Sequence, residues 1–118
     1  MDISKLYPLA AEAEKRLETV PESWSIVAVR AASGKVYTTA RTMDRLEMWR
    51  AELELVEELS DAGDGFITEL IVLCKGGALE VPGWHLRGML LALDERNGDA
   101  KVLLRGRELL EKRLADLK

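Results

Sequence analysis

Three side chains of this 118-residue chain are of types that could transfer a proton or attack an electrophile: Glu52, His85 and Cys74. Glutamate and histidine are common acid–base groups, and a cysteine thiolate is a nucleophile. His85 is the only histidine and Cys74 the only cysteine, so they do not form a recognisable metal-ligand set. The sequence does not assemble a nucleophile, a base and a group that orients the base.

Each of these residues also has a plain structural interpretation. Cys74 ends an almost continuously apolar segment, where cysteine usually serves as a small core residue. His85 lies at the start of a predicted helix, and we expect it near the surface. Glu52 belongs to an acidic segment whose other members would form a solvated helix face: Glu47, Glu54, Glu57 and Glu58.

Apolar periodicity predicts the element order α-β-β-α-β-α-β-α around these residues. Strands at 24–30 and 36–39 should pair as a hairpin across the Ser33-Gly34 turn. The segment 67–74 is apolar enough to be a central strand that is covered on both faces. We expect helices at 6–17, before the break at 61–65, from Pro82 onward and at 107–117, with a short strand at 101–104.

Leucines and other apolar residues at helical spacing predict which faces of these helices are buried. The predicted stripe of the second helix is Leu46, Trp49, Leu53, Val56 and Leu59. That of the third helix is Leu86, Met89, Leu90 and Leu93. That of the last helix is Leu109, Leu110, Leu114 and Leu117. Helices alternating with strands predict an α/β protein whose helices pack on a central sheet.

Composition bounds the class of protein. The length predicts a single domain over 1–118, and 47% hydrophobic residues predict an ordinary globular core. The net charge of -4 argues against a general nucleic-acid binder. We see no signal peptide and no apolar run that could span a bilayer, and the lone cysteine suits a reducing compartment. We therefore expect a cytoplasmic protein without a membrane partner.

Two short motifs carry a family resemblance. Arg50-Ala51-Glu52 lies in the second predicted helix, and Pro82-Gly83-Trp84-His85-Leu86-Arg87 opens the third. Together with Gly34-Lys35-Val36-Tyr37-Thr38 in the hairpin, they resemble the cytidine deaminase-like superfamily, which carries a His/Cys-Ala-Glu motif and a Pro-Cys-x-x-Cys motif at these places. The resemblance implies a three-layer α-β-α fold with a mixed central sheet. It also implies assembly as a homo-oligomer.

The zinc ligands of that superfamily are not matched. By motif placement they would fall at Arg50, Gly83 and Leu86. Glycine and leucine offer no ligand atom, and a protonated arginine repels a cation. A catalytic zinc site needs three protein ligands. The sequence therefore predicts a degenerate member of the superfamily without zinc or another cofactor, which would not be an enzyme.

The residues that remain predict a vestigial pocket. The resemblance matches Glu52 to the family's hydrogen-bonding carboxylate and Arg87 to the arginine of its second motif. We expect the Arg50 guanidinium to stand where zinc stood and to hold Glu52 ionised. We expect Trp84 to fill the hollow left by the metal. The hypothetical ligand-binding set is Arg50, Glu52, Trp84, His85 and Arg87.

Three functional hypotheses follow. The first is a non-catalytic protein of cytidine deaminase-like fold that binds a small ligand or a protein partner. The second is an interaction module of the immunity or antitoxin type, whose acidity would suit a basic partner surface. The third is an enzyme of unrelated chemistry that uses His85, Glu52 or Cys74.

Overall fold

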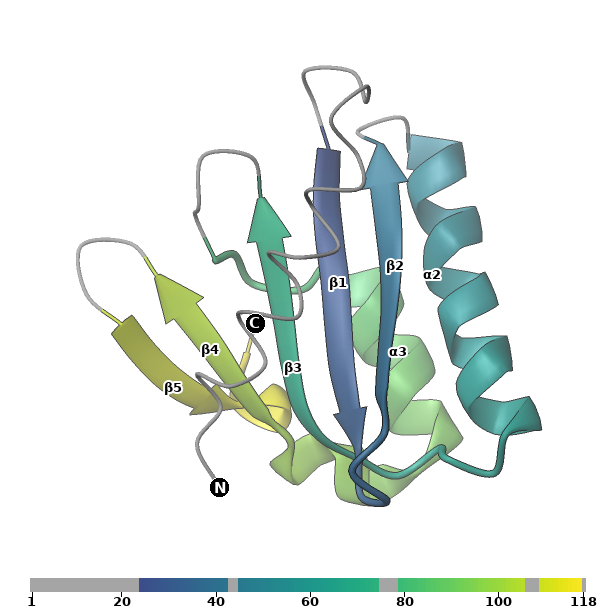
Figure 1. Ribbon diagram of the computed structural model, residues 1–118. Helices are drawn as coiled ribbons and strands as arrows, with labels where there is room; N and C mark the ends of the chain where they lie inside the picture. The colour runs from purple at the N-terminus through teal and green to yellow at the C-terminus, as the bar shows by residue number, and fades with distance from the viewer. Residues whose placement is uncertain (1–23, 43–44, 75–78, 106–108, 118) are drawn as a thin grey trace.

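The computed structural model describes residues 24–42, 45–74, 79–105 and 109–117, and Figure 1 shows their arrangement. The predicted first helix at 6–17 lies outside the described residues. The elements in chain order are β1 (Trp24–Ala31), β2 (Val36–Thr42), α2 (Arg45–Asp61), β3 (Ile67–Cys74), α3 (Trp84–Leu93), the 3₁₀ helix η2 (Glu95–Asp99), β4 (Lys101–Arg105), β5 (Leu109–Arg113) and the 3₁₀ helix η3 (Leu114–Asp116).

The strands form one five-stranded mixed sheet in the order β2-β1-β3-β4-β5. β1 and β2 are the predicted antiparallel hairpin, and Gly34 in its turn has φ +94°, a conformation that favours glycine. β1 also pairs antiparallel with β3, whereas β3 and β4 are parallel. Parallel neighbours need a crossover, which α3 and η2 provide. The prediction of an α/β fold with a mixed central sheet is confirmed.

Both described helices pack on the same face of the sheet (Figure 1). The core between these helices and the sheet contains Val27 and Val29 of β1 and Leu70 and Val72 of β3. Four helix leucines complete it: Leu55, Leu59, Leu86 and Leu90. The alternate residues Ile26 and Ile71 are also buried, at 1% and 0% exposed. β3 is therefore the central strand with two covered faces that its continuous apolar run predicts.

The buried stripe of α2 differs from the prediction. Leu46 is 72% exposed and Leu53 is 46% exposed, whereas Glu52, Leu55 and Leu59 are almost completely buried. The buried residues follow helical spacing, but one of them is a carboxylate. Apolar periodicity therefore selected a neighbouring stripe of the helix, because it cannot count a buried glutamate as a core position. Only the end of the predicted stripe, at Leu59, is fully buried.

The predicted last helix at 107–117 is wrong. The chain forms β5 there, antiparallel to β4, followed by η3. Without β5, the backbone groups at the edge of β4 would have no partners. Pairing satisfies the hydrogen bonds of that edge and of residues 109–113 together. Leu114 is nevertheless buried and Leu117 packs against the core, so these two leucines point inward as predicted.

Asn97 ties the end of α3 to the start of β3. Its Oδ1 accepts a hydrogen bond from the backbone N–H of Ile67 at 2.8 Å. Its Nδ2 donates to the carbonyls of Leu90 and Gly65 at 2.8 and 2.9 Å. The side chain is completely buried, and its amide fixes how α3 meets the sheet. Within the described ranges, neither α2 nor α3 combines the length and apolarity that a bilayer crossing requires.

Candidate functional site

Glu52 and His85 meet where α2 packs against α3. The Glu52 side chain is only 2% exposed, and its Oε1 lies 3.0 Å from Nδ1 of His85. His85 is the second residue of α3, which begins after Pro82 and the extended N-cap residue Gly83. The imidazole is 25% exposed, so it lies between the buried carboxylate and the surface.

Two tryptophans surround the imidazole. The Trp49 indole stacks on the His85 ring, with centroids 4.9 Å apart and planes 16° from parallel. Trp49 precedes Glu52 by three residues on α2, so both side chains lie on neighbouring turns of the same helix side. Trp84 meets Trp49 and His85 edge-on, with centroids at 5.6 and 5.8 Å. This packing fixes the plane of the imidazole.

The contact with Glu52 has a chemical consequence for His85. A carboxylate accepts hydrogen bonds, so it favours the tautomer in which Nδ1 carries the proton. The other ring nitrogen, Nε2, is then an acceptor and a base. Hydrolases orient a catalytic histidine with a buried carboxylate in the same way. The arrangement can therefore hold a hydrogen-bond donor or accept a proton.

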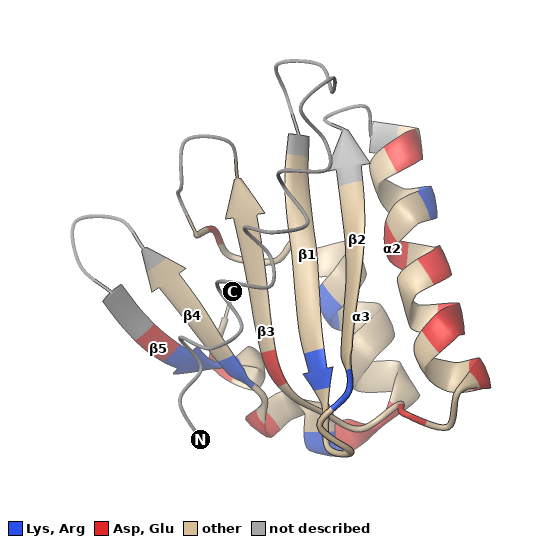
Figure 2. Cartoon of the chain, viewed as in Figure 1, with Lys and Arg blue, Asp and Glu red and all other residues tan. Residues whose placement is uncertain are grey.

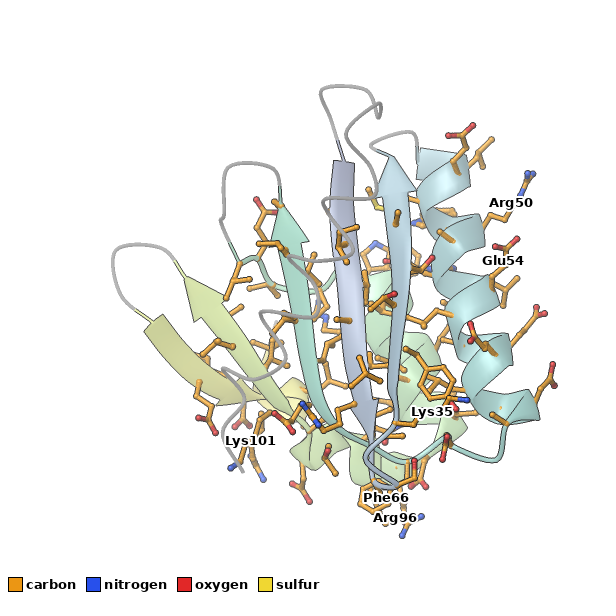
Figure 3. All side chains as sticks on the ribbon, in the orientation of Figure 1. Lys35, Arg50, Glu54, Phe66, Arg96 and Lys101 are labelled. Carbon is orange, nitrogen blue, oxygen red and sulfur yellow. The ribbon has the colours of Figure 1, made fainter. Side chains whose placement is uncertain are left out.

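Arg50 does not stand in the interior position that the sequence predicts for it. It is exposed and extends outward from α2, like Glu54 (Figure 3). Residue 50 lies two positions before Glu52, and residues at that spacing point to different sides of a helix. The side chain that lies 3.0 Å from Glu52 is the His85 imidazole, which the sequence did not predict there.

The other candidates are placed as follows. Trp84 is 68% exposed, so the prediction that it fills the hollow of a lost metal site is wrong. An aromatic ring at the first position of a helix projects from the helix end, and here its plane stands at 73° to that of Trp49 and 86° to that of His85. Arg87 is half-buried on α3. Cys74 ends β3 and packs against the core, as predicted for a small core residue.

The residues at the motif positions do not fit a zinc ion. Leu86 is completely buried in the core, Gly83 has no side chain, and Arg50 is exposed. No group of three His, Cys, Asp or Glu side chains that could hold a metal ion occurs in the part of the chain that the structure describes. The donor set of a catalytic zinc site is therefore missing at these positions.

Sequence reasoning missed the contact between Glu52 and His85. The two motifs were already assigned to neighbouring helices, so the signal was present. The sequence prediction paired Glu52 with Arg50 instead of with the histidine. Sequence reasoning also missed the stacking of Trp49 on His85, because Trp49 was assigned to the core stripe of α2.

The fold is that of cytidine deaminases of known structure. The enzyme from Burkholderia pseudomallei matches with a TM-score of 0.71 and 16% identity, over 98% of this chain and 95% of that one. The enzyme from Mycobacterium tuberculosis matches with a TM-score of 0.68 and 21% identity, over 98% and 93%. The Mycobacterium leprae enzyme matches with a TM-score of 0.71 and 16% identity, over 98% and 95%. No protein-family model and no curated protein matches the sequence.

These comparisons correct one prediction. The sequence predicts a protein that is not an enzyme, but the matched structures are all cytidine deaminases, so the fold is an enzyme fold. The sequence prediction inferred loss of all catalysis from loss of one metal site, and that step does not follow, because acid–base catalysis needs no metal. The chain has the cytidine deaminase fold, with no zinc-ligand set at the motif positions Arg50, Gly83 and Leu86.

Proposed function

We propose that the protein binds a small planar nitrogen heterocycle at His85 and acts on it by proton transfer rather than through a metal. The observation that carries this proposal is the 3.0 Å contact between the buried Glu52 carboxylate and Nδ1 of His85. Burying a carboxylate costs free energy unless it is paired. Glu52 is paired with a histidine, the side chain whose ordinary pKa lies nearest to neutral pH. The partly exposed imidazole then offers Nε2 to a ligand.

The aromatic side chains supply the second half of the site. Trp49 holds the imidazole plane from one side. Trp84 is 68% exposed beside it, so most of its indole is open to stacking with a planar ring. Arg87 is half-buried on the same helix, three residues after Trp84, a spacing that puts both side chains on one side of the helix. It belongs to the proposed site beside that indole, as a cationic group for a carbonyl or phosphate oxygen. Arg50 is exposed on the outer side of α2 and leaves the proposed site.

Pyrimidine nucleosides are the first ligands to test, because the matched structures bear the name cytidine deaminase. We expect cytidine to bind the wild-type chain in calorimetric titrations without added metal. Glu52→Gln should weaken binding about tenfold, since it removes the charge that holds the His85 tautomer. Glu54→Gln, an exposed carboxylate on the same helix, is the matched control and should leave binding unchanged.

Chromatography of the same mixtures would reveal any conversion of the nucleoside. Conversion that disappears in Glu52→Gln and His85→Asn, and survives treatment with a chelator, would support metal-independent proton transfer. Equal binding by wild type and both variants would contradict the proposal. Conversion that requires added zinc would also contradict it.

A second candidate function is binding of a protein with a basic surface, as an immunity or antitoxin factor would do. Figure 2 shows acidic residues along the outer side of α2. Leu46 and Leu53, at 72% and 46% exposed, lie among them. A second copy presenting the same face would place acid against acid, so a basic partner suits this face better. The predicted homo-oligomer is a separate proposal, which light scattering of the purified chain would test.

Binding of a basic protein to α2 is tested by tagging this chain, expressing it in its native cell and identifying the proteins that co-purify with it. We expect a basic protein that is retained by wild type, released by high salt and lost with Leu53→Asp. Leu91→Asp, at a 38% exposed leucine of α3, is the control. Equal recovery with both variants would contradict a docking face on α2.

A further inference from the structure

A row of charged residues crosses the sheet far from His85. Arg30 of β1 is paired in register with Glu69 of β3, and Glu69 with Lys101 of β4. Residues in register on neighbouring strands share a face. Arg30 follows Val29, whose side chain packs toward the helices, so the row lies on the opposite face from α2 and α3. Figure 2 shows charged residues of both signs at this end of the sheet.

Glu69 is an unusual member of this row. It is a charged side chain that is only 3% exposed, in a strand whose other residues are apolar except Thr68. Arg30 Nε lies 3.1 Å from Glu69 Oε1, but the two groups are not aligned for a hydrogen bond. Both carboxylate oxygens of Glu69 are therefore buried without a hydrogen-bond partner. A buried carboxylate normally accepts several hydrogen bonds, so Glu69 is prepared for a donor that it does not receive from the protein.

Two hollows lie at this end of the sheet, and Glu69 lines one of them. One, of about 190 Å³, is lined by Ala31, Ala32, Thr68, Glu69 and Lys101. The other, of about 330 Å³, shares Thr68 and Lys101 with it and is also lined by the apolar residues Phe66, Ile67 and Ala100. Arg96 and Asp99 complete its rim, and Arg96 stacks over the Phe66 ring at 4.0 Å (Figure 3). The shared residues make the two hollows neighbours.

We propose that these hollows bind a free amino acid with an apolar side chain. Its ammonium group donates to the unpartnered oxygens of Glu69, and its carboxylate meets the ammonium of Lys101. The apolar side chain enters the hollow lined by Phe66, Ile67 and Ala100. Neighbouring strands are about 4.8 Å apart, which suits two opposite charges carried on one α-carbon.

The charges favour a zwitterion over a simple cation or anion. Arg30 and Lys101 both lie beside Glu69, so a cation would meet an excess of positive charge. A simple anion would leave Glu69 without its donor. Lys101 already pairs with Glu111 at 3.4 Å, but both side chains are about half exposed, at 50% and 47%, and such surface pairs exchange readily. Lys101 can therefore turn to a ligand carboxylate.

The test is a titration of the full chain with L-leucine, followed by backbone amide NMR. We expect shifts at Thr68, Glu69 and Lys101, and none at His85 or Glu52. Isoamylamine, which lacks the carboxylate, and isocaproate, which lacks the amine, should each bind at least about tenfold more weakly. These probes separate the amino-acid proposal from the heterocycle site, because cytidine should not displace L-leucine.

Variants make the assignment specific. Glu69→Gln should weaken L-leucine binding about tenfold, because the amide loses the charge that holds the ammonium. Lys101→Met changes a side chain that is 50% exposed, and it should weaken L-leucine binding by a similar factor. Lys112→Met on the exposed strand β5 is the control and should bind like wild type. If Glu69→Gln does not fold, Lys101→Met and the two probes decide the question.

No shift with L-leucine or L-phenylalanine on the folded wild-type chain would remove the proposal, and Glu69 would then be satisfied by water alone. Isoamylamine binding as tightly as L-leucine would also remove it. If Lys101→Met binds L-leucine as tightly as wild type, the proposal that Lys101 meets the carboxylate of a zwitterion is wrong.

Discussion

Nδ1 of His85 on α3 lies 3.0 Å from Oε1 of Glu52 on α2, and this contact joins the two helices through one residue of each of the two sequence motifs. The carboxylate is 2% exposed and the imidazole 25% exposed. A buried acid with a partly exposed base is an arrangement that favours one tautomer of the base. The pair is therefore suited to acid–base chemistry that needs no metal.

The tautomer of His85 should depend on Glu52. We expect nitrogen NMR of the wild-type imidazole at neutral to alkaline pH to show the proton on Nδ1. Glu52→Ala should move it toward Nε2 and lower the free energy of unfolding by about 1–3 kcal/mol, because Nδ1 loses its buried partner. The same tautomer in both proteins would show that the carboxylate does not orient the ring.

The buried stripe of α2 can be checked by paired leucine substitutions. Leu55 is 1% exposed and Leu46 is 72% exposed. Leu55→Ala should cost about 2–5 kcal/mol of stability, because it leaves a cavity under the sheet. Leu46→Ala should stay within about 0.5 kcal/mol of wild type. Urea unfolding measures both, and a larger loss at Leu46 would contradict the observed phase of the helix.

Asn97 should matter more for stability than its polar side chain suggests. Asn97→Leu removes hydrogen bonds to Ile67, Leu90 and Gly65 and leaves buried backbone groups unsatisfied. We expect a loss of about 2–4 kcal/mol in denaturant unfolding. Glu95→Gln, exposed in the same 3₁₀ helix, should be close to neutral. A neutral Asn97→Leu would mean that α3 does not depend on this side chain.

Tyr37 and Asp64 predict a pH dependence of stability. The Tyr37 hydroxyl donates to Asp64, which raises the pKa of Tyr37 from 10.0 to about 12 and lowers the pKa of Asp64. The folded state holds the phenol proton more tightly, so this contribution is complete below pH 10.0 and is lost as pH rises toward 12. The Asp64 contribution is present above its ordinary pKa of 3.8 and is lost as pH falls.

Tyr37→Phe is the variant that checks this linkage. Its unfolding midpoint should be lower than that of wild type near neutral pH, and should fall less between pH 10 and 12. Ultraviolet titration of the folded protein should show one tyrosine that ionises about two units late. If wild type and variant lose stability in parallel over this range, the hydroxyl contact does not contribute.

Much of the fold could be predicted from residue patterns. The hairpin around Gly34 and the buried strand at 67–74 have strong local signals, because turn chemistry and a continuous apolar run are properties of short segments. The strand at 109–113 could not be predicted in this way. Its leucines fit helical spacing, and only the free edge of β4, a property of the folded sheet, makes it a strand.

The candidate site was only partly predictable, for the same physical reason. Motif placement assigned Glu52 and His85 to neighbouring helices. Which side chain would face Glu52 depends on the rotation of α2 and on the exact start of α3, and apolar periodicity misjudged that rotation. Glu69 shows the same limit, because its burial depends on strands that lie far apart in sequence.

The most direct test of the Glu52–His85 site is the nitrogen NMR signal of the His85 imidazole during a titration with cytidine, in protein free of metal. We predict that the Nε2 resonance shifts as cytidine binds, and that Glu52→Gln greatly reduces the shift while Glu54→Gln does not. An imidazole signal that stays unchanged while cytidine saturates the protein, or that never responds at millimolar cytidine, would contradict the proposal that His85 meets a ligand.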